Sequence, residues 1–460
     1  MTDDQRFDSF GFMGHPFLTT PNLDRLAREG IAFANSFVTT SLCCPSRATM
    51  WTGLYAHEHG VLGNRDDLAE DAVTWPRLLQ RAGFKTAFVG KWHLGGDKLT
   101  QRPGFDHWVA FRGQGQYLYP GPDRLPLEDR ALDVNGVRTP VAGYITDLLT
   151  DFAVEWLKRV PKDERFALVL SHKAAHAPHE PAERHRDAFK GAATPKPPSE
   201  KDLADLPRWL RDLSAGEFSA HAPYGGRWPN FASWYLDYHR TLLAVDESVG
   251  RVMEALAASG RLDETTVLFT SDNGFMMGER GVLDKRCFYE ESIRVPLLVR
   301  SPVVKQPGRQ PEEMVLNLDL APTLLEIGGL TPPEPMSGKS LVPLLAVEPV
   351  KWRTEWLYEY FFEKAYPETP TMIGLRTKDF KLWSFHGVPE HDALFHLADD
   401  SAERVNRWDD ASLLDRRRGL GKRLRQAADR HGLLLEPVWG RSRLATMADP
   451  PGHSEGDDGG

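Results

Sequence analysis

Three apolar runs of the sequence are each followed by polar residues, and each run comes after a stretch with helical periodicity. The apolar runs cover residues 84–90, 166–171 and 265–270, and the helical stretches cover residues 72–82, 143–160 and 235–260. Extended and helical patterns that alternate along a chain predict an α/β fold. Ligands in open α/β sheets bind at the carboxyl ends of strands, so the polar residues behind these runs are candidates for a functional site.

Composition narrows the class of protein. The 460 residues are 41% hydrophobic and 26% charged, which is enough for one main domain and a smaller one. A formal net charge of -9 argues against general nucleic-acid binding. Three cysteines imply no disulfide framework. With no long apolar run and no signal peptide at the start, we expect no membrane span and a cytoplasmic protein.

A short motif around two adjacent cysteines predicts a loop that enters a helix. Pro45 suits a first helical turn, because its missing N–H needs no helical partner there. The start of the helix favours anions and lowers the pKa of a nearby thiol, here Cys43 or Cys44. Arg47 adds a fixed cation one turn later. The alternative is a pair of ordinary buried cysteines beside a capped helix.

Basic side chains follow the first two apolar runs. Lys91 and His93 are two positions apart just past a strand, so both can project to the same side. The alternative is an unrelated pair of surface residues. After the second run come His172, His176 and His179, a spacing that a transition-metal site could also use.

Acidic and amide side chains lie at the start of the sequence and after the third run. Asp3 and Asp4 are adjacent, and Asp272 and Asn273 precede a glycine. Two acids near a terminus are usually solvated charge, and Asp-Asn-Gly is a common turn. Together, however, these side chains offer hard oxygen ligands, which suit Ca²⁺ or Mg²⁺ rather than Zn²⁺.

Taken together, these motifs resemble the type I sulfatases of the alkaline phosphatase superfamily. The resemblance extends from Asp3 to about Asn406 and includes the string from Cys43 to Gly53. It implies that Cys43 is oxidised to formylglycine by a formylglycine-generating enzyme. It also implies a Ca²⁺ ion, with Mg²⁺ as the alternative metal. The implied ligands are Asp3, Asp4, Asp272, Asn273 and the modified Cys43.

The family assigns a role to each basic residue of the motifs. The implied reaction is hydrolysis of an aryl or carbohydrate sulfate monoester by a formylglycine diol, through a sulfated enzyme intermediate. In the implied roles, Lys91 and Arg47 hold the diol and His93 is the base. His176 and Lys285 assist the leaving oxygen, and Lys91, His176 and Lys285 contact the sulfate.

The resemblance also implies an architecture. We expect a large mixed, mostly parallel sheet flanked by helices, with a small C-terminal antiparallel sheet and a closing helix. The predicted catalytic domain covers residues 1–350, the C-terminal subdomain residues 351–440, and a disordered tail residues 441–460. Family members have a hydrophobic strand ahead of the Asp pair, and we expect that strand to be missing here.

Other functions stay open at this point. A phosphonate or phosphate monoester hydrolase shares the metal cradle, and an unmodified Cys43 would leave a silent anion-binding homologue or a thiol enzyme. The motif and its continuation through residues 53–57 look most like sulfatases of sulfated sugars, such as N-acetylglucosamine-6-sulfatases. Four aromatic residues could wall a sugar pocket or pack under a loop: Trp209, Tyr224, Trp228 and Trp234.

Overall fold

The computed structural model describes most of the chain. The described residues are 1–94, 100–120, 129–196, 206–207, 209–211, 231–388 and 391–435. They belong to two compact units, Met1–Trp352 and Arg353–Gly460. The predicted tail at 441–460 and two of the aromatic candidates, Tyr224 and Trp228, lie outside the described residues.

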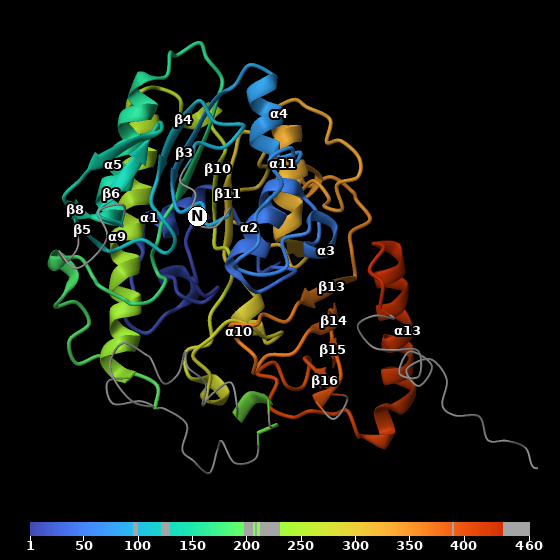
Figure 1. Cartoon of the computed structure of the whole chain (residues 1–460). Coiled ribbons are helices and arrows are strands. Elements are labelled where there is room, and N and C mark those ends of the chain that lie inside the picture. Colours follow the sequence, from blue (N-terminus) through green and yellow to red (C-terminus); the bar gives the residue numbers. More distant parts are fainter. Residues whose placement is uncertain are drawn as a thin grey trace, which may run out of the picture. The chain divides into compact units, whose positions relative to one another are not determined.

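Two sheets lie at the centre of the first unit (Figure 1). One has the strand order β7-β6-β4-β3-β9 and the other the order β1-β11-β10. The strands of the first sheet are β3 (Lys85–Gly90), β4 (His107–Ala110), β6 (Ala131–Val134), β7 (Val137–Pro140) and β9 (Phe166–Ser171). Those of the second are β1 (Ile31–Ala32), β10 (Val267–Thr270) and β11 (Leu297–Arg300). Strand β3 runs parallel to both β4 and β9, whereas the remaining pairs are antiparallel.

The first three residues of the chain join these two sheets. The Met1 amino group donates to the Leu170 carbonyl of β9 at 2.7 Å, and the Thr2 N–H donates to the Thr270 carbonyl of β10 at 2.9 Å. Thr2 also forms a parallel bridge with Ser271. The N-terminus accordingly lies in the middle of the unit, between the two sheets (Figure 1).

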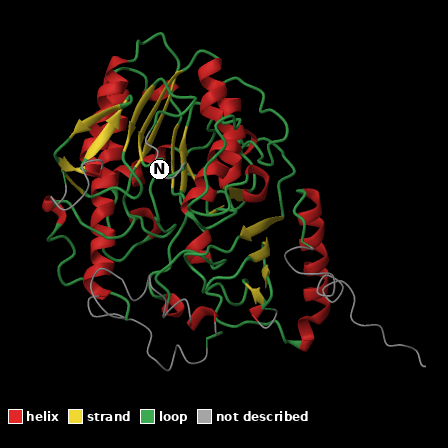
Figure 2. Ribbon diagram, viewed as in Figure 1, coloured by secondary structure: helices red, strands yellow, loops and turns green. Residues whose placement is uncertain are grey.

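Helices cover both faces of the sheets (Figure 2). One face carries α1 (Pro21–Glu29), α5 (Ile145–Arg159) and α9 (Phe231–Ala258), and the other α2 (Cys43–Thr52), α4 (Trp75–Arg81) and α11 (Leu320–Ile327). Side chains of a strand point alternately to the two faces, so β3 serves two apolar cores. Val89 belongs to the core under α5 and α9, and Phe88 to the aromatic core under α2 and α4.

Short elements complete the first unit. They are β2 (Asn35–Phe37) with β12 (Met314–Leu316), β5 (Leu118–Tyr119) with β8 (Gly143–Tyr144), α3 (Ala56–His59), α10 (Glu290–Ile293) and α12 (Val342–Leu345).

The second unit is an antiparallel sheet in the strand order β13-β14-β15-β16, covered by a helix. Its elements are β13 (Glu355–Tyr360), β14 (Met372–Thr377), β15 (Phe380–Phe385), β16 (Ala393–His396) and α13 (Leu414–Arg430). A fully buried ion pair between Lys381 and Glu403, at 2.7 Å, lies within this unit.

The predicted fold class is confirmed. The helices and the mixed sheets are those of an α/β protein, and the small antiparallel C-terminal sheet is present. Parallel pairing is concentrated at the centre, where β4, β3 and β9 run side by side. Within the described part of the chain, no helix combines the length and the apolar character that a membrane span requires.

Candidate active site

Four neighbouring strand ends bring the candidate residues together. Lys91 follows β3, His172 follows β9, Asp3 follows the segment at the N-terminus and Asp272 follows β10. Gly90 makes the exit from β3 possible, because its φ is +124° and a Cβ there would lie 1.8 Å from the Ser171 carbonyl oxygen. The carboxyl ends of parallel strands thus meet at one edge, as the sequence predicts.

Helix α2 carries Cys43 at its first residue, and all of its residues are buried. The Cys43 sulfur lies 3.7 Å from Asp3 Oδ1 and accepts from Lys285 Nζ at 2.9 Å. The predicted lowering of the thiol pKa is wrong for this structure. Burial raises the pKa of Cys43 to about 12, and the nearby Lys285 and Lys91 reduce that effect only in part. The unmodified side chain is therefore a protonated thiol at neutral pH.

Arg47 lies one turn into α2 and is completely buried. Its Nε donates to Asp272 Oδ2 at 2.9 Å, and its Nη1 donates to the Lys91 carbonyl at 2.6 Å and to Ser171 Oγ at 3.0 Å. Arg47 consequently ties the start of α2 to the ends of β3, β9 and β10.

Three carboxylates crowd together beside Cys43. Oxygens of Asp3, Asp4 and Asp272 all lie within 4.8 Å of one another, and the three residues are buried. Burial, followed by the charge of Asp3, raises the pKa of Asp272 to about 6. Burial also raises the pKa of Asp4. For Asp3 burial acts in the same sense, but the adjacent cations, Lys91 foremost, hold its pKa well below the usual value.

Two oxygens of this cluster accept no hydrogen bond from the described residues. The Asn273 amide nitrogen donates to Asp4 Oδ1 at 2.6 Å and to the Gly274 carbonyl at 2.8 Å. Within the described residues, Asp4 Oδ2 and Asn273 Oδ1 accept no hydrogen bond although both are buried. Buried polar atoms normally have a partner, so two acceptors without one beside three carboxylates fit a cation as the missing partner.

Lys91 and His93 lie on the same side of the site. Lys91 is completely buried, and its ammonium donates to Asp3 Oδ2 and to Gln114 Oε1. His93 Nε2 lies 3.4 Å from the Gln114 amide nitrogen. Burial, with Lys91 and Arg47, lowers the pKa of His93 well below its ordinary value, so the imidazole is neutral.

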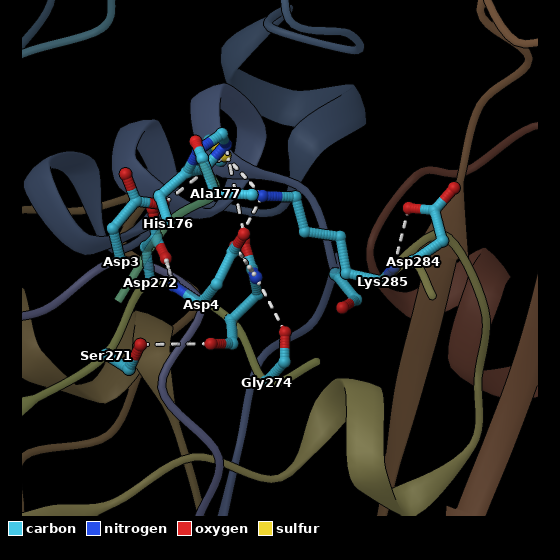
Figure 3. A network of polar contacts seen from close by, with 12 residues as sticks. Asp3, Asp4, His176, Ala177, Ser271, Asp272, Gly274, Asp284 and Lys285 are labelled. Carbon is cyan, nitrogen blue, oxygen red and sulfur yellow. Dashed lines mark hydrogen bonds and ion pairs between the residues drawn. The ribbon is translucent and has the colours of Figure 1, made fainter. Parts of the chain in front are cut away.

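The three histidines behind β9 do not form one cluster. His176 points into the acidic site, with Nε2 3.8 Å from Asp4 Oδ2 (Figure 3). Its Nδ1 lies 2.7 Å from the Ala177 carbonyl. His172 instead contacts Ser248 Oγ at 3.1 Å, and the His179 ring packs 5.0 Å from that of Trp234. Burial is the main cause of the lowered pKa of His176.

Lys285 reaches the site from outside the strand ends. Its ammonium donates to Asp4 Oδ1 as well as to Cys43 (Figure 3). Burial lowers the pKa of Lys285, but the surrounding negative groups, Asp4 foremost, together outweigh burial and raise that pKa well above its ordinary value. The ammonium thus stays charged and faces both Asp4 and Cys43.

Sequence reasoning missed two polar residues beside the site. Gln114 lies in a loop without a periodic pattern, and its contacts with Lys91 and His93 come only from folding. Lys173 is buried, lies 4.9 Å from the centre of the Tyr117 ring, and donates to the Ala177 carbonyl at 3.4 Å. In the sequence, only its position directly after His172 marks Lys173 as a neighbour of the site.

Of the aromatic candidates, Trp234 packs in the apolar core, and Trp209 is buried.

This geometry agrees with a match to a family profile. The profile described as Sulfatase matches residues 1–330, which is most of the chain. The chain belongs to the sulfatase family. A second profile, described as the C-terminal part of N-sulphoglucosamine sulphohydrolase, matches residues 278–430. The protein is accordingly a sulfuric ester hydrolase with an alkaline phosphatase-like fold, as the motifs predict.

Relatives of this sulfatase act on sulfated sugars. It is 33% identical to an N-acetylglucosamine-6-O-sulfatase of Bacteroides thetaiotaomicron, over 88% of this chain and 81% of that protein. It is 30% identical to the human N-acetylglucosamine-6-sulfatase, over 76% of this chain and 65% of that protein. A solved structure of a protein in complex with its substrate D-glucosamine-2-N,6-O-disulfate is 30% identical, with a TM-score of 0.81 over 94% of this chain and 97% of that one.

Proposed function

We propose that this sulfatase removes the 6-O-sulfate group of a glucosamine unit in a sulfated saccharide. The observation that carries the proposal is the likeness, across 94% of the chain, to a structure bound to D-glucosamine-2-N,6-O-disulfate. The N-acetylglucosamine-6-O-sulfatase of Bacteroides thetaiotaomicron supports the same substrate class.

The proposal includes a divalent cation, Ca²⁺ or Mg²⁺, held by Asp3, Asp4, Asp272 and Asn273. The residues fit such an ion, because three buried carboxylates repel one another and two of the four residues offer an oxygen without a donor. An all-oxygen set favours a hard cation, and Ca²⁺ accepts the irregular arrangement more readily than Mg²⁺. When bound, the ion would neutralise negative charge and polarise an oxygen ligand.

The proposal also includes conversion of Cys43 to formylglycine by a formylglycine-generating enzyme. The aldehyde hydrate would supply a hydroxyl nucleophile. The unmodified thiol is a weak nucleophile at neutral pH, because burial raises its pKa to about 12. The contacts of Cys43 with Lys285 and Asp3 place a cation and a carboxylate next to the reacting position.

Five cationic or neutral side chains then take part in the proposed reaction. Lys91 and Lys285 neutralise the sulfate oxygens, and the buried Arg47 fixes the groups around them. His93 is kept neutral, as a base must be before it accepts a proton. His176 lies beside Asp4, and we assign it to the leaving oxygen. In a buried site such fixed charges stabilise developing charge without reorganisation.

One substrate separates the proposal from its alternatives. Glucosamine-2-N,6-O-disulfate carries both an O-sulfate and an N-sulfate, so NMR of the product sugar shows which bond breaks. We expect release of the 6-O-sulfate by the wild-type enzyme produced with a formylglycine-generating enzyme, and none by Cys43→Ala. Release of the N-sulfate would overturn the proposed position of cleavage.

A second substrate pair tests the ester class. The chain is also 25% identical to the phosphonate monoester hydrolase of Agrobacterium radiobacter, with a TM-score of 0.76. We expect the kcat/KM for an aryl sulfate to exceed that for the phosphonate ester of the same aryl alcohol. A clear preference for the phosphonate ester would contradict the proposed sulfate substrate and favour a phosphonate monoester hydrolase.

A further inference from the structure

The loop between β4 and β5 brings one amide side chain against two basic groups of the site. Gln114 Oε1 accepts from Lys91 Nζ, and the Gln114 amide nitrogen lies 3.4 Å from His93 Nε2. The side chain is half-buried, between these groups and solvent. A single residue therefore contacts both members of the Lys-x-His pair that follows β3.

The orientation of this amide follows from Lys91. An ammonium has donors and no acceptor, so the oxygen of Gln114 must face Lys91 and its NH₂ group must face His93. An NH₂ group can only donate, so His93 Nε2 accepts and carries the lone pair. In the neutral imidazole the proton is then on Nδ1.

The described residues offer His93 little other support. Its Nδ1 is buried without a hydrogen-bond partner among them, and the contact of its own carbonyl with Cys44 fixes the backbone and not the ring. The groups that act on its charge are Lys91, Arg47 and Lys285, which disfavour the imidazolium, and Asp3, which favours it. Among the described residues, the contact with Gln114 is thus the one that orients the ring and selects its tautomer.

We propose that Gln114 is a positioning residue that links Lys91 to His93 and keeps His93 Nε2 available as a proton acceptor. The inference rests on the proposed roles of Lys91 and His93 in the sulfatase reaction. It adds a residue outside the family motifs, from the loop between β4 and β5, with a half-buried side chain.

The test is the substitution Gln114→Glu, which keeps the shape of the side chain and replaces the NH₂ donor by an acceptor. A carboxylate beside His93 stabilises the imidazolium, so its pKa rises by about one unit or more. Because the base is lost on protonation, we expect the acid limb of the kcat profile to move to higher pH by a similar amount. We expect the fall in kcat to reach about tenfold on the acid limb and to be smaller at neutral pH, where a base with a strongly lowered pKa stays mostly unprotonated.

Gln116→Glu is the matched control. It introduces the same charge in the same loop, but the described hydrogen bonds of the Lys91 and His93 side chains run to Asp3 and Gln114. We expect its pH profile to match that of the wild type. A second variant, Gln114→Met, removes both hydrogen bonds without adding charge, so kcat should fall while the acid limb stays near its wild-type position.

A readout without turnover completes the test. Long-range ¹H–¹⁵N NMR of histidine reports tautomer and pKa, and the His93→Gln variant identifies the His93 signals. We expect the Nδ1–H tautomer in the wild type and a raised pKa in Gln114→Glu. Identical His93 signals and pH profiles in Gln114→Glu and Gln116→Glu would overturn the inference. A wild-type enzyme inactive on all sulfate esters would instead overturn the proposed function.

Discussion

The Lys285 ammonium lies 2.9 Å from the Cys43 sulfur, although 242 positions separate the two residues in the sequence. The same ammonium pairs with Asp4, so one cation faces both the proposed nucleophile position and the proposed metal site. Fixed charge close to a reacting centre is worth most where water is excluded, and here both partners are buried.

Lys285→Met should lower kcat/KM for a sulfate ester about 100-fold or more, because a fixed cation at the reacting position is lost. Activity per folded molecule, with the folded fraction taken from circular dichroism, measures this effect. Lys381→Met is the control. It also breaks a fully buried lysine–carboxylate pair and should cost about 3–5 kcal/mol of stability, but it should leave kcat/KM of the folded molecules unchanged. Equal losses of activity in both variants would contradict a catalytic role for Lys285.

Mass spectrometry of the tryptic peptide from Glu29 to Arg47 tests the nucleophile. We expect the mass of an aldehyde or its hydrate at Cys43 after co-expression with a formylglycine-generating enzyme, together with labelling by an aldehyde reagent. Cys44→Ser should keep both the modification and most of the activity, because a hydroxyl can replace the thiol as donor to the His93 carbonyl. An intact thiol at Cys43 in a fully active enzyme would exclude this mechanism.

Removal of divalent cations should abolish activity and lower the temperature of unfolding. The three buried carboxylates then have only protein cations, Lys91, Arg47 and Lys285, as counter-charges. Ca²⁺ at about 100 times its Kd should raise the free energy of unfolding by about 2.7 kcal/mol. Asp272→Asn should weaken this response. Asp246→Asn is its control, because Asp246 caps the start of α1 through the backbone of Asn22 and Leu23. A Ca²⁺ response that is the same in both variants would contradict the proposed ligand set.

We expect Lys173 to make the free energy of unfolding depend on pH. Burial, with Lys91, lowers its pKa from 10.5 to about 7, so the charged form is disfavoured in the folded protein. The resulting cost is absent above about pH 10.5, grows as the pH falls to about 7, and is constant below that value. Lys173→Met should therefore be more stable than the wild type at about pH 7, by an amount that shrinks as the pH rises.

Denaturant unfolding of both proteins at several pH values measures the difference. Lys158→Met is the control, because it makes the same substitution at an exposed lysine of α5 that pairs with the exposed Glu155. We expect its stability difference from the wild type to be small at every pH. A stability difference for Lys173→Met that does not change between about pH 7 and pH 10 would contradict the lowered pKa.

Much of the fold could be predicted from local patterns. The strand predicted over residues 166–171 is β9, and the helix predicted over residues 235–260 corresponds closely to α9. Such elements have strong periodicity and clear ends. The short hairpin of β6 and β7 was not predicted, because strands this brief are fixed by pairing and not by their own sequence.

The site could be predicted where a motif follows a strand, and not elsewhere. Lys91 and Asp272 come directly after strands, so topology alone brings them to one edge. Gln114 reaches the same place from a loop, and no rule of sheet topology predicts where a loop residue lies. The pKa of Cys43 depends on a balance between burial and two lysines far away in the sequence, and that balance is invisible before the chain is folded.

The segment that carries Asp3 also closes the seam between the two sheets. The Asp3 N–H donates to the Ala174 carbonyl, the Ala175 N–H donates to the Asp3 carbonyl, and the Asp272 N–H donates to the Thr2 carbonyl. A ligand that binds the Asp3 carboxylate therefore also stabilises these three backbone hydrogen bonds. Amide hydrogen exchange at Ala175 and Asp272 should slow when the site is filled, so that occupancy is reported by backbone protection in the middle of the molecule.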